Sequence, residues 1–171
     1  MNYKKIQLLE IKDNFFQRIG TDWMLVSAGT PGDSNAMTAS WGQIGILWNK
    51  PVATMYIRPQ RYTRQFTDRD DRFSLSFFAP GENRKALGIM GSKSGRDCDK
   101  IAEAGLSIQG FGENNIAAFD GASLIIICRK IYHQDLTEDS FVDLSIIDEM
   151  YPEKDYHRMY VGEIEEVFLK E

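Results

Sequence analysis

The stretch VATMYIRPQRYTR, residues 52–64, joins a strand pattern to a cluster of arginines. Over residues 52–58, the Ala, Met and Ile side chains fall on one face of an extended chain, and Val, Thr, Tyr and Arg fall on the other. Pro51 and Pro59 stand just outside the two ends, where a strand tolerates proline. We therefore predict a strand over residues 52–58 that runs directly into a basic turn.

This basic turn has two interpretations. The guanidinium groups of Arg58 and Arg61 match the oxygens of a phosphate, and the hydroxyl of Thr63 adds a donor. If Thr63 also caps a short helix, the first amides of that helix point toward the same anion. Alternatively, the arginines pair with acidic side chains close by in the sequence, namely Asp68, Asp70 and Asp71. The residues alone leave both interpretations open.

Strand patterns recur on both sides of this stretch. We expect strands over residues 23–28, 38–48, 52–58, 73–78, 122–132 and 159–169. Short helices are expected from Thr63, over residues 82–90, and over residues 97–104. Gly105 stands just after the last of these, where a glycine often ends a helix. Strict β-α-β alternation is missing, so the chain favours a mainly β fold, a closed or partly open β-barrel with short helices.

Two further stretches could contact a ligand. GSKSGRDCDK, residues 91–100, fails the spacing of a phosphate-binding P-loop, but Ser94 and Lys100 could reach an anion. SNAMTASWGQ, residues 34–43, has small residues whose backbone could meet a flat polar ligand, although a core strand with a loose beginning has the same pattern. The large aromatic residues nearby are expected to pack in the core or at an interface: Trp41, Trp48 and Tyr56.

Composition limits the classes of function. At 171 residues and 43% hydrophobic content, residues 1–171 form a single domain, and a formal net charge of −5 argues against nucleic-acid binding. No stretch is apolar and long enough to span a membrane, so we expect a cytoplasmic protein. Cys98 and Cys128 show no C-x-x-C spacing, and no metal site is predicted. No signature identifies catalytic residues, so any hard chemistry would come from a cofactor.

Four motifs in order carry a family resemblance: NAMTASWG, KPVATMYIRPQRYT, FSLSFF and GSKSGRDCDK. Their order and spacing resemble the flavin reductase-like family of FMN-binding split β-barrel proteins, which includes flavoredoxins. The resemblance implies a Greek-key split barrel and a homodimer that holds FMN non-covalently near the dimer interface.

The resemblance also implies a cofactor site. The segment around residues 37–41 would line the isoalloxazine ring, and the basic turn would bind the ribityl phosphate with Ser94 and Lys100. The expected cofactor-binding residues are Asn35, Met37, Thr38, Ala39, Ser40, Trp41, Arg58, Arg61, Tyr62, Thr63, Ser94 and Lys100. Arg64 is expected to be exposed to solvent, and His157 to lie at the surface or an interface.

The function implied is that of an FMN-dependent oxidoreductase. It would accept electrons from NAD(P)H or a redox partner and pass them to a second acceptor, small molecule or protein, as a flavin reductase or a flavoredoxin-like carrier does. Two alternatives remain: a cofactor-free binding module on the same barrel, in which the arginines pair with aspartates, and a flavin oxidase similar to pyridoxamine-phosphate oxidases.

Overall fold

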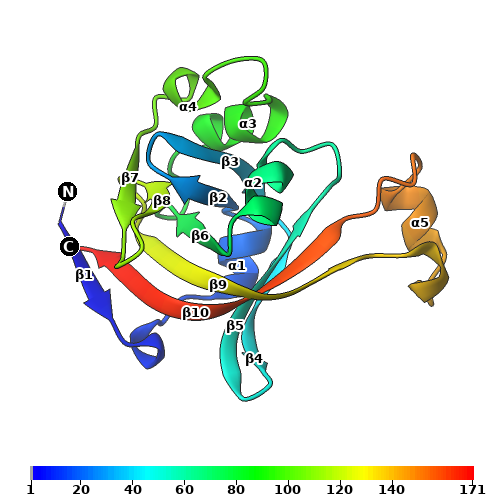
Figure 1. The fold of residues 1–171 in the computed structure, drawn as a ribbon, viewed down its shortest axis with the longest axis horizontal. Helices are drawn as coiled ribbons and strands as arrows, with labels where there is room; N and C mark the ends of the chain where they lie inside the picture. The colour runs from blue at the N-terminus through cyan, green and yellow to red at the C-terminus, as the bar shows by residue number, and fades with distance from the viewer. Residues whose placement is uncertain (1) are drawn as a thin grey trace.

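Antiparallel strands dominate the fold of the computed structural model, which describes residues 2–171 (Figure 1). Eight strands form one sheet in the order β3-β2-β6-β9-β10-β5-β4, and β1 pairs with β10. These strands are β1 (Tyr3–Ile6), β2 (Met24–Thr30), β3 (Asp33–Ala39), β4 (Gly42–Leu47), β5 (Lys50–Ile57), β6 (Arg72–Phe77), β9 (Leu124–Asp135) and β10 (Arg158–Lys170). A separate hairpin consists of β7 (Ile108–Phe111) and β8 (Ile116–Phe119).

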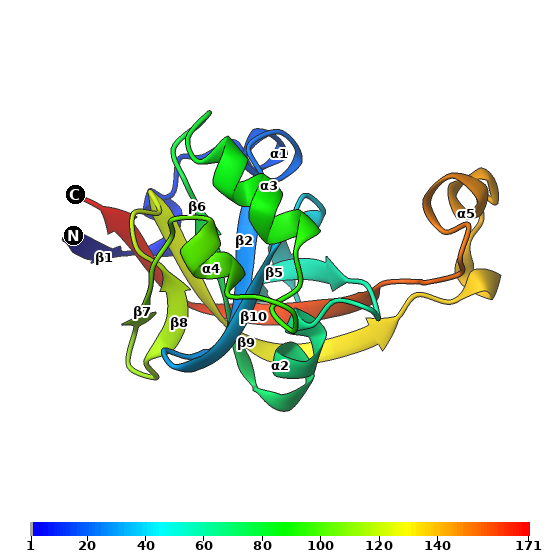
Figure 2. The ribbon, with the colours of Figure 1, turned by 90° about the horizontal axis from the view of Figure 1, so that it is seen from above.

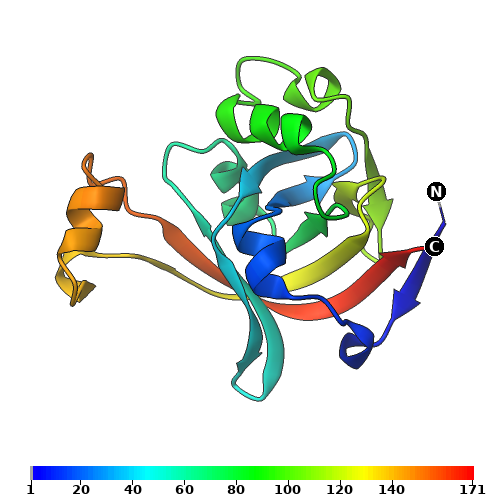
Figure 3. The same cartoon turned by 180° about the vertical axis from the view of Figure 1, so that it is seen from behind.

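The helices are short and lie around the sheet. They are α1 (Phe15–Gly20), α2 (Thr63–Arg69), α3 (Arg84–Ser92), α4 (Lys100–Glu103) and α5 (Ser145–Met150), with 3-10 turns at Leu8–Glu10 and Glu138–Ser140. Helix α3 covers β2 and β3, and α1 lies beside β4 (Figure 3). The mainly β fold with short helices that the sequence predicts is confirmed.

The strands β9 and β10 carry a projecting arm. Residues 136–157 connect these two strands, and α5 stands at the far end of the connection, away from the barrel (Figures 1 and 2). We call residues 136–157 the arm. It brings side chains from late in the sequence toward the ends of β3 and β5.

Two apolar clusters pack on the two faces of the central strands. Val26 and Ile126 belong to the cluster inside the barrel. Their neighbours Leu25, Ile125 and Ile127 belong to a second cluster, beneath α3 and the β7–β8 hairpin. Because both faces of β9 are covered, this strand reads as a continuous apolar run in the sequence and lacks an alternating pattern.

The strand predicted over residues 38–48 is wrong as a single element. The chain forms β3 up to Ala39 and β4 from Gly42, with Ser40 and Trp41 between them. Strands β3 and β4 are the two ends of the sheet path, so the chain must leave one edge here and join the other. Gly42 allows this crossing, since a Cβ there would lie 2.7 Å from the carbonyl oxygen of Thr54.

The predicted helices are confirmed in place but differ at their ends. Helix α2 begins at Thr63, yet the capping position is Tyr62, so the predicted cap at Thr63 is wrong. Helix α4 is shorter than the predicted helix over residues 97–104, since it begins at Lys100 and ends at Glu103, but Gly105 lies just after its end with a φ of +67°, as expected of a glycine after a helix. The sequence did not predict β1, β7, β8, α1 or α5, which are short and weakly patterned.

A glycine in β10, Gly162, packs closely on the barrel interior. At Gly162, a Cβ would lie 2.6 Å from the ring of Phe73 and 2.7 Å from the Cβ of Cys128. The register between β9 and β10 shifts between Val161 and Gly162. The shift bends the long strand around the core, as bulges do at the corners of barrels.

Within residues 2–171, none of the helices combines the length and the apolar character that a membrane crossing requires.

Candidate functional site

A cavity of about 220 Å³ opens where β3 and β5 end. It is lined by residues 37–41 together with Tyr56, Arg58, Arg61 and His157. We call it the basic cavity. It brings together two of the stretches that the sequence analysis singled out, the segment after Asn35 and the basic turn.

Arg61 and Lys100 place positive charge beside this cavity. The guanidinium of Arg61 donates to the carbonyl oxygens of Gly91 (2.5 Å) and Met90 (3.4 Å), at the end of α3. The buried ammonium of Lys100 donates to the carbonyl oxygens of Met90 (3.3 Å) and Lys93 (3.2 Å). Both cations therefore lie at the same helix end.

Neither of these two cations forms an ion pair with a carboxylate within residues 2–171. Burial lowers the pKa of Arg61, and burial together with the charge of Arg61 lowers the pKa of Lys100 to about 8. Buried charges in proteins are normally paired. The basic cavity thus leaves room for an anion that would offset the charge of Arg61.

Arg58 lines the same cavity but is already paired. Its guanidinium donates to Asp155 (2.5 Å) and to the carbonyl oxygen of Met150 (2.7 Å), and it lies 5.0 Å from the ring centre of Tyr151. All three partners belong to the arm. The predicted pairing of the arginines with Asp68, Asp70 or Asp71 is therefore wrong for both Arg58 and Arg61.

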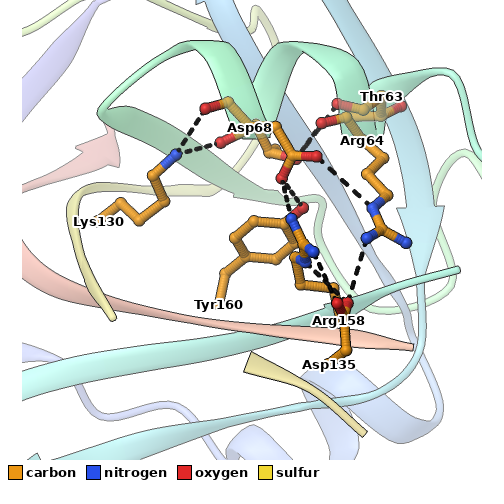
Figure 4. Close-up of polar contacts among 8 residues, drawn as sticks. Thr63, Arg64, Asp68, Lys130, Asp135, Arg158 and Tyr160 are labelled. Atoms are coloured by element: carbon orange, nitrogen blue, oxygen red, sulfur yellow. Dashed lines mark hydrogen bonds and ion pairs between the residues drawn. The ribbon is translucent and has the colours of Figure 1, made fainter. Parts of the chain in front are cut away.

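Arg64 was expected to be exposed, and this expectation is wrong. Its side chain is 17% exposed and forms ion pairs with Asp68 (3.6 Å) and Asp135 (3.1 Å) (Figure 4). Arg158 bridges the same two carboxylates, and the hydroxyl of Tyr160 donates to Asp68 at 2.5 Å. This network ties α2, which follows the basic turn, to β9 and β10.

Asn35 and Thr63 link β3 to α2. The amide of Asn35 donates to the hydroxyl of Thr63 at 2.8 Å, and both side chains are buried. Gly95 packs against Asn35, since a Cβ at this glycine would lie 2.3 Å from the Asn35 side-chain oxygen. The structure thus gives Thr63 and Asn35 a positioning role that the sequence pattern did not reveal.

A second hollow borders Asn35. It has a volume of about 460 Å³, and Ser34, Asn35 and Lys100 line it together with residues 95–99. The guanidinium of Arg96 lies over the ring of Tyr62, with its central carbon 4.7 Å from the ring centre. Most of the expected cofactor-binding residues line one of these two cavities, whereas Tyr62, Thr63 and Ser94 line neither.

His157 was expected at the surface or an interface, but it is buried. Its ring lies 4.9 Å from that of Trp41, and its Nδ1 is 2.9 Å from the hydroxyl of Tyr151. Burial, and then the charge of Arg58, lower the pKa of His157 to about 4. The imidazole is therefore neutral near pH 7 and lines the basic cavity as a neutral group.

A larger cavity of about 840 Å³ adjoins the basic cavity. The two share Ser40, Trp41 and Tyr56. We call it the apolar cavity, because aromatic and aliphatic side chains from α1, β4 and the arm form most of its wall. Trp41 is 40% exposed and Trp48 is 58% exposed, so neither residue packs in the core, and the alternative expectation of a place at an interface stays a prediction.

No three His, Cys, Asp or Glu side chains within residues 2–171 are grouped so that they could hold a metal ion. The two cysteines are free and separate. Cys128 is buried in β9, and burial raises the pKa of its thiol.

Comparisons with known proteins identify related folds. The sequence matches the family model of the flavin reductase like domain over residues 16–171, whereas comparison with curated proteins gives no match. The FMN-binding domain of a flavin reductases-like enzyme from Shewanella baltica OS155 has a TM-score of 0.69 at 17% identity, covering 98% of this chain and 77% of that chain.

Two other solved structures have similar scores. Flavoredoxin from Methanosarcina acetivorans has a TM-score of 0.65 at 21% identity, covering 88% of this chain and 69% of that chain. An NADH:FAD oxidoreductase from Streptomyces globisporus C-1027 has a TM-score of 0.65 at 15% identity, covering 88% of this chain and 75% of that chain. At these identities the likeness shows a shared fold, the split β-barrel.

Proposed function

Because this chain belongs to the flavin reductase-like family, we propose that it binds FMN non-covalently as a redox cofactor. The observation that supports this most directly is a pair of cations at the end of α3, the half-buried Arg61 and the buried Lys100, without a carboxylate partner within residues 2–171. A phosphate dianion in the basic cavity would pair with Arg61 through charge-assisted hydrogen bonds, and Lys100, which donates to the same Met90 carbonyl oxygen as Arg61, would add positive charge close by. The rival interpretation, a cofactor-free module with every arginine paired, does not account for Arg61.

The residues around the cavity fit the remaining parts of this cofactor. Residues 37–41 would lie along the ring, and Asn35 and Thr63 hold the neighbouring backbone in place through their hydrogen bond. Bound FMN would supply two-electron transfer at its ring. Trp41 and Tyr56 would exclude water from one side of that ring, and the neutral imidazole of His157 would offer a hydrogen-bonding group at its edge.

We further propose that NAD(P)H or a redox partner supplies the electrons and that a second acceptor removes them. The names of two structural relatives, an NADH:FAD oxidoreductase and a flavoredoxin, support a reductase and an electron carrier respectively. Anaerobic addition of NADH or NADPH to the FMN-loaded protein separates these roles. Loss of the flavin absorbance within seconds indicates a reductase, and an unchanged spectrum indicates a carrier.

A homodimer is the proposed assembly. Large apolar side chains stand exposed at the tip of the β4–β5 hairpin and on the arm: Ile46, Trp48, Val142 and Leu144. Exposed apolar patches of this kind mark protein contact surfaces.

The cofactor proposal is tested by FMN titration, followed by quenching of flavin fluorescence. We expect Arg61→Gln to weaken FMN binding about 10- to 100-fold, because a hydrogen bond to a charged group contributes about 1.5–3 kcal/mol. Arg69→Gln is the matched control, since Arg69 pairs with Asp33 and Asp70 outside both cavities near Arg61. Absence of FMN binding by the unmodified protein, or equal affinity in Arg61→Gln, would contradict the proposal.

A further inference from the structure

We propose that Asp155 of the arm determines how tightly the basic cavity binds a phosphate group, because it holds Arg58 in an ion pair with which that phosphate must compete. This inference rests on the proposed function, which places the phosphate of FMN in the basic cavity. It gives the arm control over the affinity of the cavity, through a carboxylate that lies 97 residues from Arg58 in the sequence.

The charge of the basic cavity depends on this ion pair. Arg58 and Arg61 are the charged side chains that line the cavity within residues 2–171, and His157 is neutral near pH 7. Asp155 offsets the charge of Arg58, whereas Arg61 forms no ion pair with a carboxylate in the same part of the chain. The cavity therefore offers an anion less positive charge than its two arginines carry.

Several contacts hold Arg58 and Asp155 together. Nη1 of Arg58 donates to Oδ1 of Asp155 at 2.5 Å, and Nη2 donates to the carbonyl oxygen of Met150 at 2.7 Å. Gln60 donates to the other carboxylate oxygen, Oδ2, at 2.7 Å. The guanidinium also lies over the ring of Tyr151, 5.0 Å from the ring centre. Both ends of the guanidinium fork therefore already have acceptors on the arm.

The ion pair is open to competition from an anion. The side chain of Arg58 is 27% exposed, and that of Asp155 is 19% exposed. An ion pair that water can reach contributes little to stability, whereas a guanidinium binds phosphate through two parallel charge-assisted hydrogen bonds. A phosphate in the cavity can therefore take Arg58 from Asp155, and the cost of separating the pair lowers the affinity for that phosphate.

A second contact between the arm and the cavity keeps Asp155 close. His157, two residues after Asp155, lines the cavity, and its ring lies 4.9 Å from that of Trp41. Its Nδ1 is 2.9 Å from the hydroxyl of Tyr151. These contacts do not involve Arg58, so Asp155 remains near the cavity when a phosphate binds. Its carboxylate then competes for Arg58 at a high effective concentration.

The test is isothermal titration calorimetry of the FMN-free protein with inorganic phosphate, at pH 7 and constant ionic strength. Asp155→Asn keeps the size of the side chain and removes its charge. We expect this variant to bind phosphate about tenfold more tightly than the unmodified protein, because the freed guanidinium adds charged hydrogen bonds. Asp155→Glu keeps the carboxylate and should stay within about threefold of the unmodified protein.

Two controls separate competition for Arg58 from a general effect of charge. Asp148→Asn makes the same change at an exposed position of α5 and should alter the affinity by less than about twofold, since solvent and salt screen exposed charges. In an Arg58→Gln background, Asp155→Asn should raise the affinity by less than about threefold, because no guanidinium is freed and the field of one screened charge remains.

Four results would overturn the inference. They are equal phosphate affinities of Asp155→Asn and the unmodified protein, no phosphate binding by either, an equal gain from Asp148→Asn, and an equal gain in the Arg58→Gln background. The last two would mean that charge acts through solvent and that the pair with Arg58 has no special role.

Titrations with FMN and riboflavin, which differ by the phosphate group, report separately on the cofactor proposal. Asp155→Asn should tighten FMN binding about tenfold and leave riboflavin binding within about twofold, because riboflavin offers nothing to the freed guanidinium. If the phosphate results hold but neither flavin binds, the cofactor proposal is wrong and the inference stands. If FMN binds with the same affinity to Asp155→Asn and the unmodified protein, the inference is wrong and the cofactor proposal stands.

Discussion

His157 is the buried polar residue at which the barrel, the arm and the basic cavity meet. It contacts Trp41 between β3 and β4, and it contacts Tyr151 at the end of α5. The charge of Arg58 is close enough to disfavour a second positive charge on its ring. A neutral, buried imidazole at this position makes the stability of the protein depend on pH.

The first prediction concerns this dependence. The pKa of His157 is about 4 in the folded protein, below the value of about 6.5 expected when it is unfolded, so protons bind more tightly to the unfolded chain. Protonation of His157 therefore leaves the free energy of unfolding unchanged above about pH 6.5 and lowers it as the pH drops toward 4. After allowance for partial screening by solvent, we expect a loss of about 1–2 kcal/mol between pH 7.5 and pH 5.0.

Urea unfolding at the two pH values checks this prediction. His157→Gln removes the titrating group and should lose clearly less stability than the unmodified protein over the same interval. His133→Gln is the control, since His133 is exposed on β9, and it should keep the original dependence. An identical pH dependence in His157→Gln and the unmodified protein would rule out His157 as its source.

At the scale of the element, α2 is held between the basic turn and the long strands. Lys130 of β9 donates to the carbonyl oxygens of Thr67 (2.5 Å) and Asp68 (3.2 Å) at the last turn of α2. Near the other end, Thr63 accepts the hydrogen bond from Asn35 of β3. A helix of seven residues has little stability by itself, so these contacts fix its position and that of the basic turn before it.

The second prediction concerns Asp68. Its carboxylate pairs with Arg64 and Arg158 and accepts a hydrogen bond from the hydroxyl of Tyr160. Burial alone would raise its pKa, but the hydrogen bond from Tyr160 and the charges of Arg158 and Arg64 outweigh burial and lower the pKa. We expect Asp68→Asn to lower the free energy of unfolding at pH 7 by about 1–2 kcal/mol, as expected when charged hydrogen bonds are weakened. Because the folded pKa is lowered, this contribution is present above about pH 4 and is lost as the pH falls further.

Asp71→Asn serves as the comparison, measured in urea at the same pH. Asp71 is 77% exposed and pairs with Arg72 at the surface, so its substitution should change stability by less than about 0.5 kcal/mol. Equal effects of Asp68→Asn and Asp71→Asn would mean that the network contributes no more than an ordinary surface pair.

At the scale of the whole molecule, the barrel has two apolar projections, the β4–β5 hairpin and the arm. Trp48 stands at the hairpin tip with a φ of +53°, and Asn49 follows with a φ of +57°. A two-residue turn with positive φ favours Asn or Gly, and a bulky side chain in this conformation is unfavourable. An exposed Trp in a strained turn is consistent with a residue that contacts a partner.

The third prediction follows from this surface. We expect the unmodified protein to sediment as a dimer and Trp48→Asp to weaken the dimer at least tenfold, since a charge would be buried in an apolar contact. Leu9→Asp changes an even more exposed apolar residue, in the first 3-10 turn, and should leave the dimer intact. A monomer at all concentrations, or a dimer insensitive to Trp48→Asp, would contradict the proposed interface.

The sequence by itself determined the elements that depend on local pattern. The alternation in residues 52–58 and 73–78 predicted β5 and β6, and the apolar run before Cys128 predicted β9, because burial of one or both strand faces is repeated along the strand itself. Gly105 marked the end of α4 for an equally local reason, the left-handed backbone that glycine tolerates. The order of four motifs was enough to recognise the family.

Only the tertiary structure decided the partners of the charges and the shapes of the cavities. Arg58 pairs with Asp155, 97 residues away, whereas Arg61 beside it in the sequence has no carboxylate partner within residues 2–171. His157 and the apolar cavity depend on how the arm returns to the barrel. Local periodicity reports which face of a strand is buried, but a charge pairs with whatever the fold brings within about 4 Å. That distance is set by segments far apart in the chain, and no short stretch of sequence records it.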